Sequence, residues 1–189
     1  MSDFFDLLII RRSIRDFEER TVPQNLIMDI IKDSCLAPSS GNGQPWKFII
    51  VNNQDLIKRL SDDSKKNILS SIEKDPTSPS KKYEGILKDK NFNVFYNSPS
   101  LIMIVGANNH RSTYVDCTLA ACYFMLSASA RGLGTCWINL GADIRAHDLL
   151  EEIGLPEGHK IVAPIILGYP KEIPSIPSRK EPQILRVIT

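Results

Sequence analysis

Apolar residues gather in short continuous runs at three places along the chain: residues 46–52, 100–107 and 160–170. Each run is rich in branched side chains, which is typical of a strand that is buried on both faces of a sheet. Residues 135–140 (TCWINL) follow closely spaced glycines and are expected to form a further strand or an extended turn. The pattern therefore predicts a sheet in the middle of the molecule.

Stretches with helical spacing lie between these runs. Leu26, Ile27, Ile30 and Ile31 form one apolar stripe, which predicts a helix that Pro38 stops. Further helices are expected at residues 3–10, 54–72, 112–134 and 142–154. Strands separated by helices predict a layered α/β or α+β domain.

The segment 112–134 differs from the other predicted helices, because small and apolar residues surround it almost completely between Val115 and Ala130. A helix without a polar face is central rather than superficial. Its repeated alanines and serines also permit the close approach of another helix, including one from a second subunit.

Two segments have weaker patterns. Residues 73–97 combine prolines with many lysines, and we expect an excursion with one short helix, mobile or ordered by a partner. The tail after residue 170 is too rich in proline to be helical in its first part. Its closing ILRVI is a strand candidate that is too short to be stable alone, so it must add to a sheet.

Composition and charge exclude several classes of partner. The chain has 189 residues, of which 42% are hydrophobic and 24% charged, with a formal net charge of +1. Without a basic excess to collect phosphates, nucleic acid is not expected as a partner. No run reaches the length of a membrane span, and MSDFFDLLIIRRS lacks a basic stretch ahead of a cleavage site. We therefore expect a cytoplasmic protein of one domain that binds neither nucleic acid nor a membrane.

The four cysteines and three histidines form no metal-ligand pattern. No C-x-x-C occurs, and no histidine stands at ligand spacing around a cysteine. We expect no metal site and interpret the cysteines as free, mostly buried thiols in a reducing compartment. Cys136 has a second interpretation as a redox-active thiol, although burial as a small hydrophobic residue is favoured.

The basic cluster RRSIR, residues 11–15, admits two interpretations. On a helix, Arg11 and Arg15 share one face, and nearby acidic residues neutralise them in a solvated, salt-bridged helix end. Alternatively, the guanidinium groups and the Ser13 hydroxyl converge on a phosphate, which arginine binds with paired hydrogen bonds. The motif alone favours the first interpretation.

Residues 37–48, APSSGNGQPWKF, are polar but uncharged up to Trp46. A turn before a strand explains Pro38, the glycines and Trp46, which then anchors the core. It leaves Asn42 and Gln44 unexplained, because a loop that only contacts water has no need of neutral amides. A planar heterocycle with carbonyls and ring nitrogens would use such donors and acceptors.

The segment GLGTCWIN, residues 132–139, is also ambiguous. Its glycines either cap a helix or let something flat approach the backbone, with Trp137 and Ile138 as apolar cover. The G-x-G lacks the third glycine and the preceding strand of a dinucleotide fingerprint, and no P-loop, G-x-S-x-G or H-E-x-x-H occurs. Groups suited to holding a cofactor outnumber groups suited to catalysis, which indicates a cofactor that brings its own chemistry.

Taken in order, RRSIRDF, APSSGNGQPWKF, GLGTCWIN and the ILGYP…PSRKEP tail resemble the FMN-dependent nitroreductase family over essentially the whole chain. The resemblance implies one FMN-binding domain over residues 1–189 with an α+β fold, in which helices wrap a central mixed β-sheet in three layers. It also implies an intertwined homodimer with FMN at the subunit interface. Residues 170–189 would extend over the partner and give ILRVI its sheet, and residues 73–97 would form a lid.

The resemblance also implies roles for particular residues. Arg11, Ser13 and Arg15 would contact the flavin phosphate and ring edge, with Arg12 beside them. The residues implied near the reactive flavin nitrogen are Trp137, Ile138 and Asn139. At the phosphate end, the implied residues are Gly168 and Arg179. The partner subunit would line the ring and ribityl chain with Pro38, Ser39, Ser40, Asn42 and Gln44.

The implied reaction is ping-pong. NADH or NADPH reduces the flavin, and a small electron acceptor, a nitroaromatic or a quinone, is then reduced in the same place. Arg15 is the candidate for the positive charge near the anionic reduced ring, and no side chain need act as an acid or base. Asn139-Leu140 stands where larger members carry a Glu-Gly pair, so the contacts at the flavin N5 side are expected to differ.

Other chemistries are compatible with the same cofactor. They are reductive dehalogenation, flavin destruction, and flavin binding without turnover in a sensor or carrier. The ordinary length of the tail and the lack of an added N-terminal membrane segment disfavour dehalogenation.

Overall fold

A four-stranded sheet forms the middle of the molecule, which the computed structural model describes over residues 3–189. The strands are β1 (Lys47–Val51), β2 (Ser100–Ala107), β3 (Gly134–Trp137) and β4 (His159–Gly168), in the order β1-β2-β4-β3. All neighbouring strands pair antiparallel. The parallel component of the expected mixed sheet is an isolated bridge between Ser13 and Thr135.

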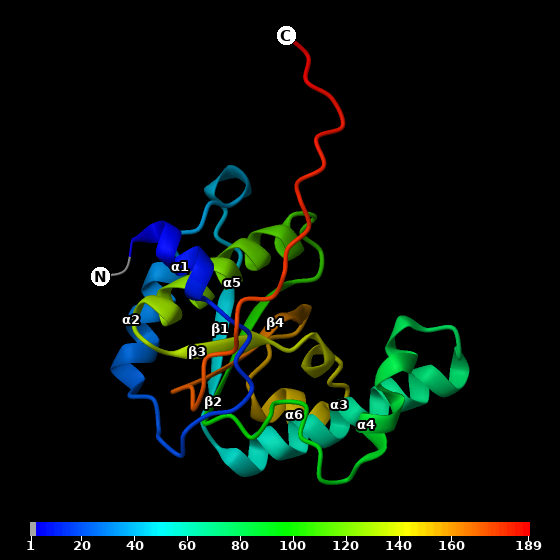
Figure 1. Ribbon diagram of the computed structural model, residues 1–189. Coiled ribbons are helices and arrows are strands. Elements are labelled where there is room, and N and C mark those ends of the chain that lie inside the picture. Colours follow the sequence, from blue (N-terminus) through cyan, green and yellow to red (C-terminus); the bar gives the residue numbers. More distant parts are fainter. Residues whose placement is uncertain (1–2) are drawn as a thin grey trace.

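Helices cover both faces of this sheet (Figure 1). On one face, α2 (Gln24–Ser34) and α5 (Thr113–Ala130) share a core with alternate residues of β2. On the other face, α3 (Gln54–Lys74) and α6 (His147–Glu152) share a core with the intervening residues of β2. Successive side chains of a strand point to opposite faces, so one continuous apolar run supplies both cores. The predicted three-layer α+β fold is confirmed.

Strand β1 departs from its prediction, because it is only partly buried along most of its length. Phe48, Ile49 and Ile50 are half-buried, and Val51 is buried. The expected burial on both faces is wrong because β1 lies at the edge of the sheet, where its side chains have strand neighbours on one flank only.

Residues 73–97 pack into the chain itself. They contain a 3-10 turn at Pro79–Tyr83 and the short helix α4 (Glu84–Lys88). Leu87, Val94 and Phe95 of this segment are at most 1% exposed and belong to the α3-side core. The predicted short helix is confirmed, and the expected mobile excursion is instead held to the core by three apolar anchors.

The N-terminal helix and the C-terminal tail leave apolar side chains exposed. Helix α1 (Phe4–Ile10) contacts α5, yet Phe5 is 68% exposed. The tail, red in Figure 1, leads away from the body, and Leu185 is 96% exposed. ILRVI forms no strand within this chain, so its pairing with a sheet stays a prediction. No helix in residues 3–189 is both long and apolar enough to cross a membrane.

Candidate functional site

The basic cluster at residues 11–15 is extended rather than helical. Helix α1 ends at Ile10, and Arg11 has an extended ψ of 125°. The backbone N–H of Ile14 donates to the carbonyl oxygen of Thr135 at 2.9 Å, so the cluster runs beside β3. The helical interpretation is therefore wrong, because pairing with the edge of the sheet replaces a further helical turn.

An extended backbone sends alternate side chains to opposite sides. Arg11, Ser13 and Arg15 thus share one side of the strand-like segment, and all three act on the same buried thiol. Burial raises the pKa of Cys136, and Arg15, Ser13 and Arg11 partly oppose that rise. The structure therefore brings the three predicted phosphate and ring ligands together on the β3 side of the sheet.

The guanidinium groups of this cluster have no carboxylate partner among residues 3–189. Arg12 and Arg15 donate only to backbone carbonyl oxygens, and the nearby Asp16 pairs with Lys171 at 3.1 Å instead. The salt-bridged interpretation is thus excluded for the described chain. Several uncompensated positive charges on one short segment are instead suited to binding an anion.

Arg12 lies apart from its neighbours. Its side chain is 7% exposed, and one terminal nitrogen, Nη1, donates to the carbonyl oxygen of Arg11 at 2.5 Å. The other, Nη2, is buried without a partner in the described chain. The residue Arg12 lines a small cavity of about 60 Å³ with Ile14 and Leu133. The part of Arg12 in cofactor binding, beside its neighbours, stays a prediction.

Two glycines let the basic cluster lie close against the sheet. A Cβ atom at Gly134 would stand 2.7 Å from Ile14, and one at Gly168 would stand 2.7 Å from Phe17. Gly134 and Gly168 face each other across β3 and β4. Gly168 is therefore explained by packing, and its predicted place near a phosphate is not tested by this contact.

A pocket of about 360 Å³ opens beside the basic cluster. Its volume lies in the range of small-molecule sites. It brings together the predicted Arg15, Trp137, Ile138 and Asn139. The remaining lining residues are Leu140, which follows Asn139, and five residues of the segment expected to form a lid; these five, not singled out individually from the sequence, are Pro79, Ser80, Lys82, Tyr83 and Tyr96.

The five lining residues from the segment 73–97 could not be singled out because the sequence pattern of this segment is weak. One signal of function appears only in the backbone. Tyr96 has φ 53°, a left-handed conformation that is rare for a bulky residue and that concentrates at functional sites. Tyr96 also lies under the guanidinium of Arg15, with 5.7 Å between the guanidinium carbon and the ring centre.

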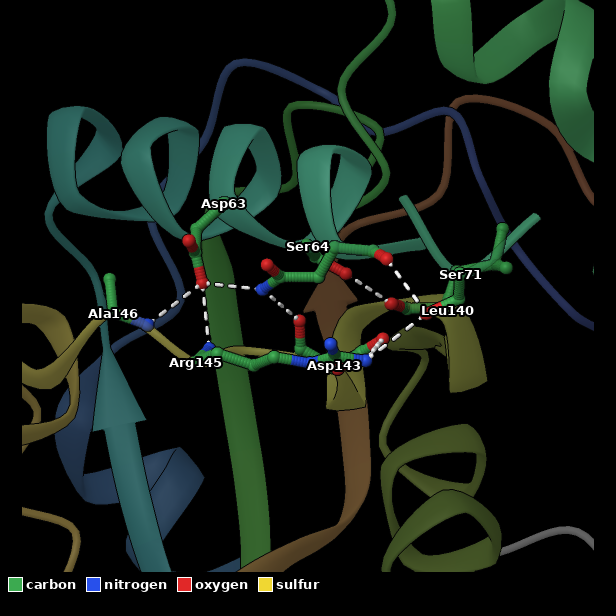
Figure 2. Close-up of polar contacts among 8 residues, drawn as sticks. Asp63, Ser64, Ser71, Leu140, Asp143, Arg145 and Ala146 are labelled. Atoms are coloured by element: carbon green, nitrogen blue, oxygen red, sulfur yellow. Dashed lines mark hydrogen bonds and ion pairs between the residues drawn. The ribbon is translucent and has the colours of Figure 1, made fainter. Parts of the chain in front are cut away.

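Polar contacts from α3 hold the segment that follows the pocket residue Asn139 (Figure 2). Ser64 donates to the carbonyl oxygen of Leu140, directly after the pocket residue Asn139. Asn67 donates to the carbonyl oxygen of Asp143 at 2.9 Å. Asp63 accepts from the backbone N–H of Arg145 at 2.7 Å. These bonds hold the segment after Trp137 against α3.

The loop at residues 38–44 is held by its own hydrogen bonds and does not line the Arg15 pocket. The backbone N–H of Gln44 donates to Ser39 Oγ at 3.0 Å, and the side-chain amide of Gln44 donates to Asn42 Oδ1 at 3.1 Å. Asn42 and Gln44 have φ values of 55° and 44°, a strain that concentrates at functional sites. Ser40 is tied to α5, because its N–H donates to Asp116 at 3.1 Å. Asp116 is a buried anchor that the sequence did not single out.

The two halves of the predicted site lie at opposite edges of the sheet. The loop at residues 38–44 leads into β1, whereas the basic cluster and Trp137 lie at β3. With neighbouring strands roughly 4.8 Å apart, three spacings separate these edges by roughly 14 Å. One chain therefore does not bring Pro38, Ser39, Ser40, Asn42 and Gln44 to its own Arg15 pocket. Arg179, in the exposed tail, also lies outside that pocket.

The residues that the chain does assemble fit a flavin mononucleotide. Its phosphate would find unpaired arginines, and its ring would find aromatic and apolar side chains. The indole N–H of Trp137 is buried without a partner among the described residues, which leaves a donor for a group outside this chain. No cluster of three or more His, Cys, Asp or Glu residues in the described part of the chain is arranged to hold a metal ion.

Comparisons with known proteins find relatives in sequence and in fold. The chain is 27% identical over 179 residues to an Archaeoglobus fulgidus protein provisionally named an NADH dehydrogenase/NAD(P)H nitroreductase, with 91% of this chain and 88% of that protein covered. Its fold matches a Bacteroides fragilis nitroreductase crystallised with FMN, with a TM-score of 0.82, 22% identity and all of both chains covered.

The same fold occurs in a protein with another named activity. An iodotyrosine deiodinase crystallised with FMN and 3-iodo-L-tyrosine matches with a TM-score of 0.78 and 19% identity, covering 97% of this chain and 99% of that one. The model of the nitroreductase family matches residues 9–169, which include the basic cluster, the loop at residues 38–44 and every strand of the sheet. The chain therefore belongs to the nitroreductase family.

Proposed function

We propose that the protein is an FMN-dependent oxidoreductase that takes electrons from NADH or NADPH and passes them to a small acceptor, a nitroaromatic or a quinone. The observation that carries the proposal is the group of arginines at residues 11–15, without carboxylate partners, beside the pocket at Trp137. FMN-bound and NAD(P)H-named relatives support the choice of cofactor and donor.

Each part of the chain has a separate task in this proposal. Arg11 and Ser13 hold the phosphate and ring edge, and Trp137, Ile138 and Asn139 cover one side of the ring. When bound, FMN supplies the hydride-accepting chemistry. Arg15 holds a positive charge beside the ring, which stabilises the negative charge that develops on reduction. Donor and acceptor use the same open side in turn, and protons come from water.

We further propose that residues 1–189 form one FMN-binding domain that works as a homodimer. A second copy would bring its loop at residues 38–44 to the Arg15 pocket, which one chain cannot do across its own sheet. The exposed apolar residues of α1, the outward face of α5 and the tail offer the surface that such a dimer would bury. In this arrangement Arg179 of the tail pairs with the phosphate.

Anaerobic addition of NADH or NADPH tests the enzymatic proposal. We expect the purified protein to be yellow, to bleach within minutes, and to regain its colour on addition of a nitroaromatic or a quinone. Absorption spectra record each step, with an iodinated aromatic added in parallel to detect dehalogenation through released halide. A protein that stays oxidised for hours is no oxidoreductase, and one that takes up no FMN is no flavoprotein.

The shared site predicts that flavin and dimer are lost together. Dilution to monomer, followed by size-exclusion chromatography with light scattering and flavin absorption, should release FMN. A variant that ends at Pro170 should be shifted toward monomer and bind FMN more weakly, because it lacks Arg179 and the exposed apolar tail. A monomer that retains FMN at full affinity contradicts the shared site.

A further inference from the structure

The pocket beside Trp137 combines positive charge with aromatic surface. Its lining includes Arg15, Lys82, Tyr83 and Tyr96, and no Asp or Glu of residues 3–189 lines it. Each cation lies near a tyrosine ring: Arg15 at 5.7 Å from the centre of Tyr96, and Lys82 at 4.9 Å from the centre of Tyr83. A ligand in this pocket therefore meets flat rings and cations but no negative side chain.

Two neighbouring lysines on the 3-10 turn at Pro79–Tyr83 have different surroundings. Lys81 lies 2.6 Å from one oxygen of Glu84, and Lys88 lies 2.9 Å from the other. Both oxygens of the carboxylate are thus engaged. Lys82 has no carboxylate partner among residues 3–189, and it is the lysine that lines the pocket.

We propose that the electron acceptor of this site is an aromatic compound that carries a carboxylate, and that Lys82 determines this preference. The inference rests on the proposed function, which assigns Arg15 to the flavin and so leaves Lys82 as the cation that faces the acceptor. The aromatic ring of the acceptor packs against the tyrosines on the open side of the flavin, and its carboxylate accepts a hydrogen bond from the Lys82 ammonium group.

The same cation could attract an anion of the electron donor. NADPH carries a phosphate that NADH lacks, and an unpaired lysine beside the pocket is suited to it as well. Lys82 lines the pocket together with Tyr83, and this shared position with an aromatic ring favours the acceptor. Both ligands are therefore measured in the same experiment.

The test compares an acid with its neutral amide on the oxidised, FMN-loaded protein. 4-Nitrobenzoate and 4-nitrobenzamide are titrated while the flavin absorption band is followed, which yields dissociation constants without turnover. We expect 4-nitrobenzoate to bind about tenfold more tightly, as one partly exposed charge-assisted hydrogen bond allows, and the difference to shrink in high salt.

Variants assign this preference to one side chain. Lys82→Met should abolish the difference between acid and amide, and Lys82→Arg should keep it. Lys81→Met is the matched control, because it removes the same charge from the same turn outside the pocket. NADH and NADPH are compared by their KM values in all variants.

Several results would overturn the inference. They are equal affinity of the wild-type protein for acid and amide, a Lys82→Met variant that keeps the preference, and an equal effect of Lys81→Met. A Lys82→Met variant that changes only the NADPH-to-NADH ratio assigns the lysine to the donor instead. A protein that takes up no FMN overturns the proposed function as well, whereas a yellow protein with equal affinities overturns this inference alone.

Discussion

Replacing Arg11 with alanine is expected to weaken FMN binding by about 1.5–3 kcal/mol, which is roughly ten- to hundredfold, the usual range for a charge-assisted hydrogen bond. Arg11 lies on the same side of the extended cluster as Ser13 and Arg15, and it has no carboxylate partner in residues 3–189. Its removal therefore breaks no internal ion pair. The loss in affinity should appear without a matching loss in stability.

Titration of the flavin-free protein with FMN, followed by flavin fluorescence, measures the effect. Arg20→Ala is the matched control, because Arg20 stacks on Tyr169 with 3.8 Å between the guanidinium carbon and the ring centre and lies outside the site. It changes the net charge equally and should leave FMN affinity unchanged. An Arg11→Ala variant with wild-type affinity, or an equal loss in Arg20→Ala, would remove the phosphate assignment.

The sheet and its covering helices could be predicted from the sequence, because their patterns are continuous. Both faces of β2 are buried by helices, so the whole run at residues 100–107 is apolar and its assignment is unambiguous. The run at residues 46–52 looks the same in sequence but forms an edge strand. Apolar content alone does not distinguish a central strand from an edge strand, because strand order is a property of the whole sheet.

Candidate site residues could be proposed from the sequence where residue type alone carries the information. Arginines in a cluster and neutral amides in a loop indicate ligands whatever their backbone conformation. The conformation of RRSIR was not predictable, because no glycine or proline separates it from α1. After α1 the chain pairs with partners far along the sequence, through the hydrogen bonds from Ile14 to Thr135 and from Glu18 to Tyr169.

Lys82 and Tyr96 were missed for a different reason. They lie in a segment without periodicity, and the anchors that fold it, Leu87, Val94 and Phe95, are too widely spaced to form a helical or strand pattern. Their position at the pocket depends on tertiary packing. The sequence therefore indicates candidates for cofactor binding more readily than candidates for substrate binding.

Replacing Gly134 with alanine is expected to affect stability and cofactor binding together. The added Cβ would stand 2.7 Å from one carbon of Ile14 and 2.8 Å from two others. Ile14 cannot move aside easily, because it is branched at Cβ, 3% exposed, and bound through its backbone to Thr135 at 2.9 Å. The substitution must push residues 11–15 away from β3.

We expect Gly134→Ala to lower the free energy of unfolding by about 1–3 kcal/mol, the usual cost of overpacking a closely packed site. FMN affinity should also fall, because the displaced segment carries Arg11, Ser13 and Arg15. Urea unfolding of the flavin-free protein and FMN titration measure the two effects separately.

Gly85→Ala is the matched control, because nothing lies within 4 Å of a Cβ atom at that position in α4. Its stability should stay within about 0.5 kcal/mol of wild type or rise slightly through helix propensity, with FMN affinity unchanged. If Gly134→Ala loses stability but keeps full FMN affinity, the arginines do not depend on their contact with β3. If it loses neither, the close approach of Ile14 to β3 does not position the cluster, and the proposed link between sheet packing and phosphate binding is wrong.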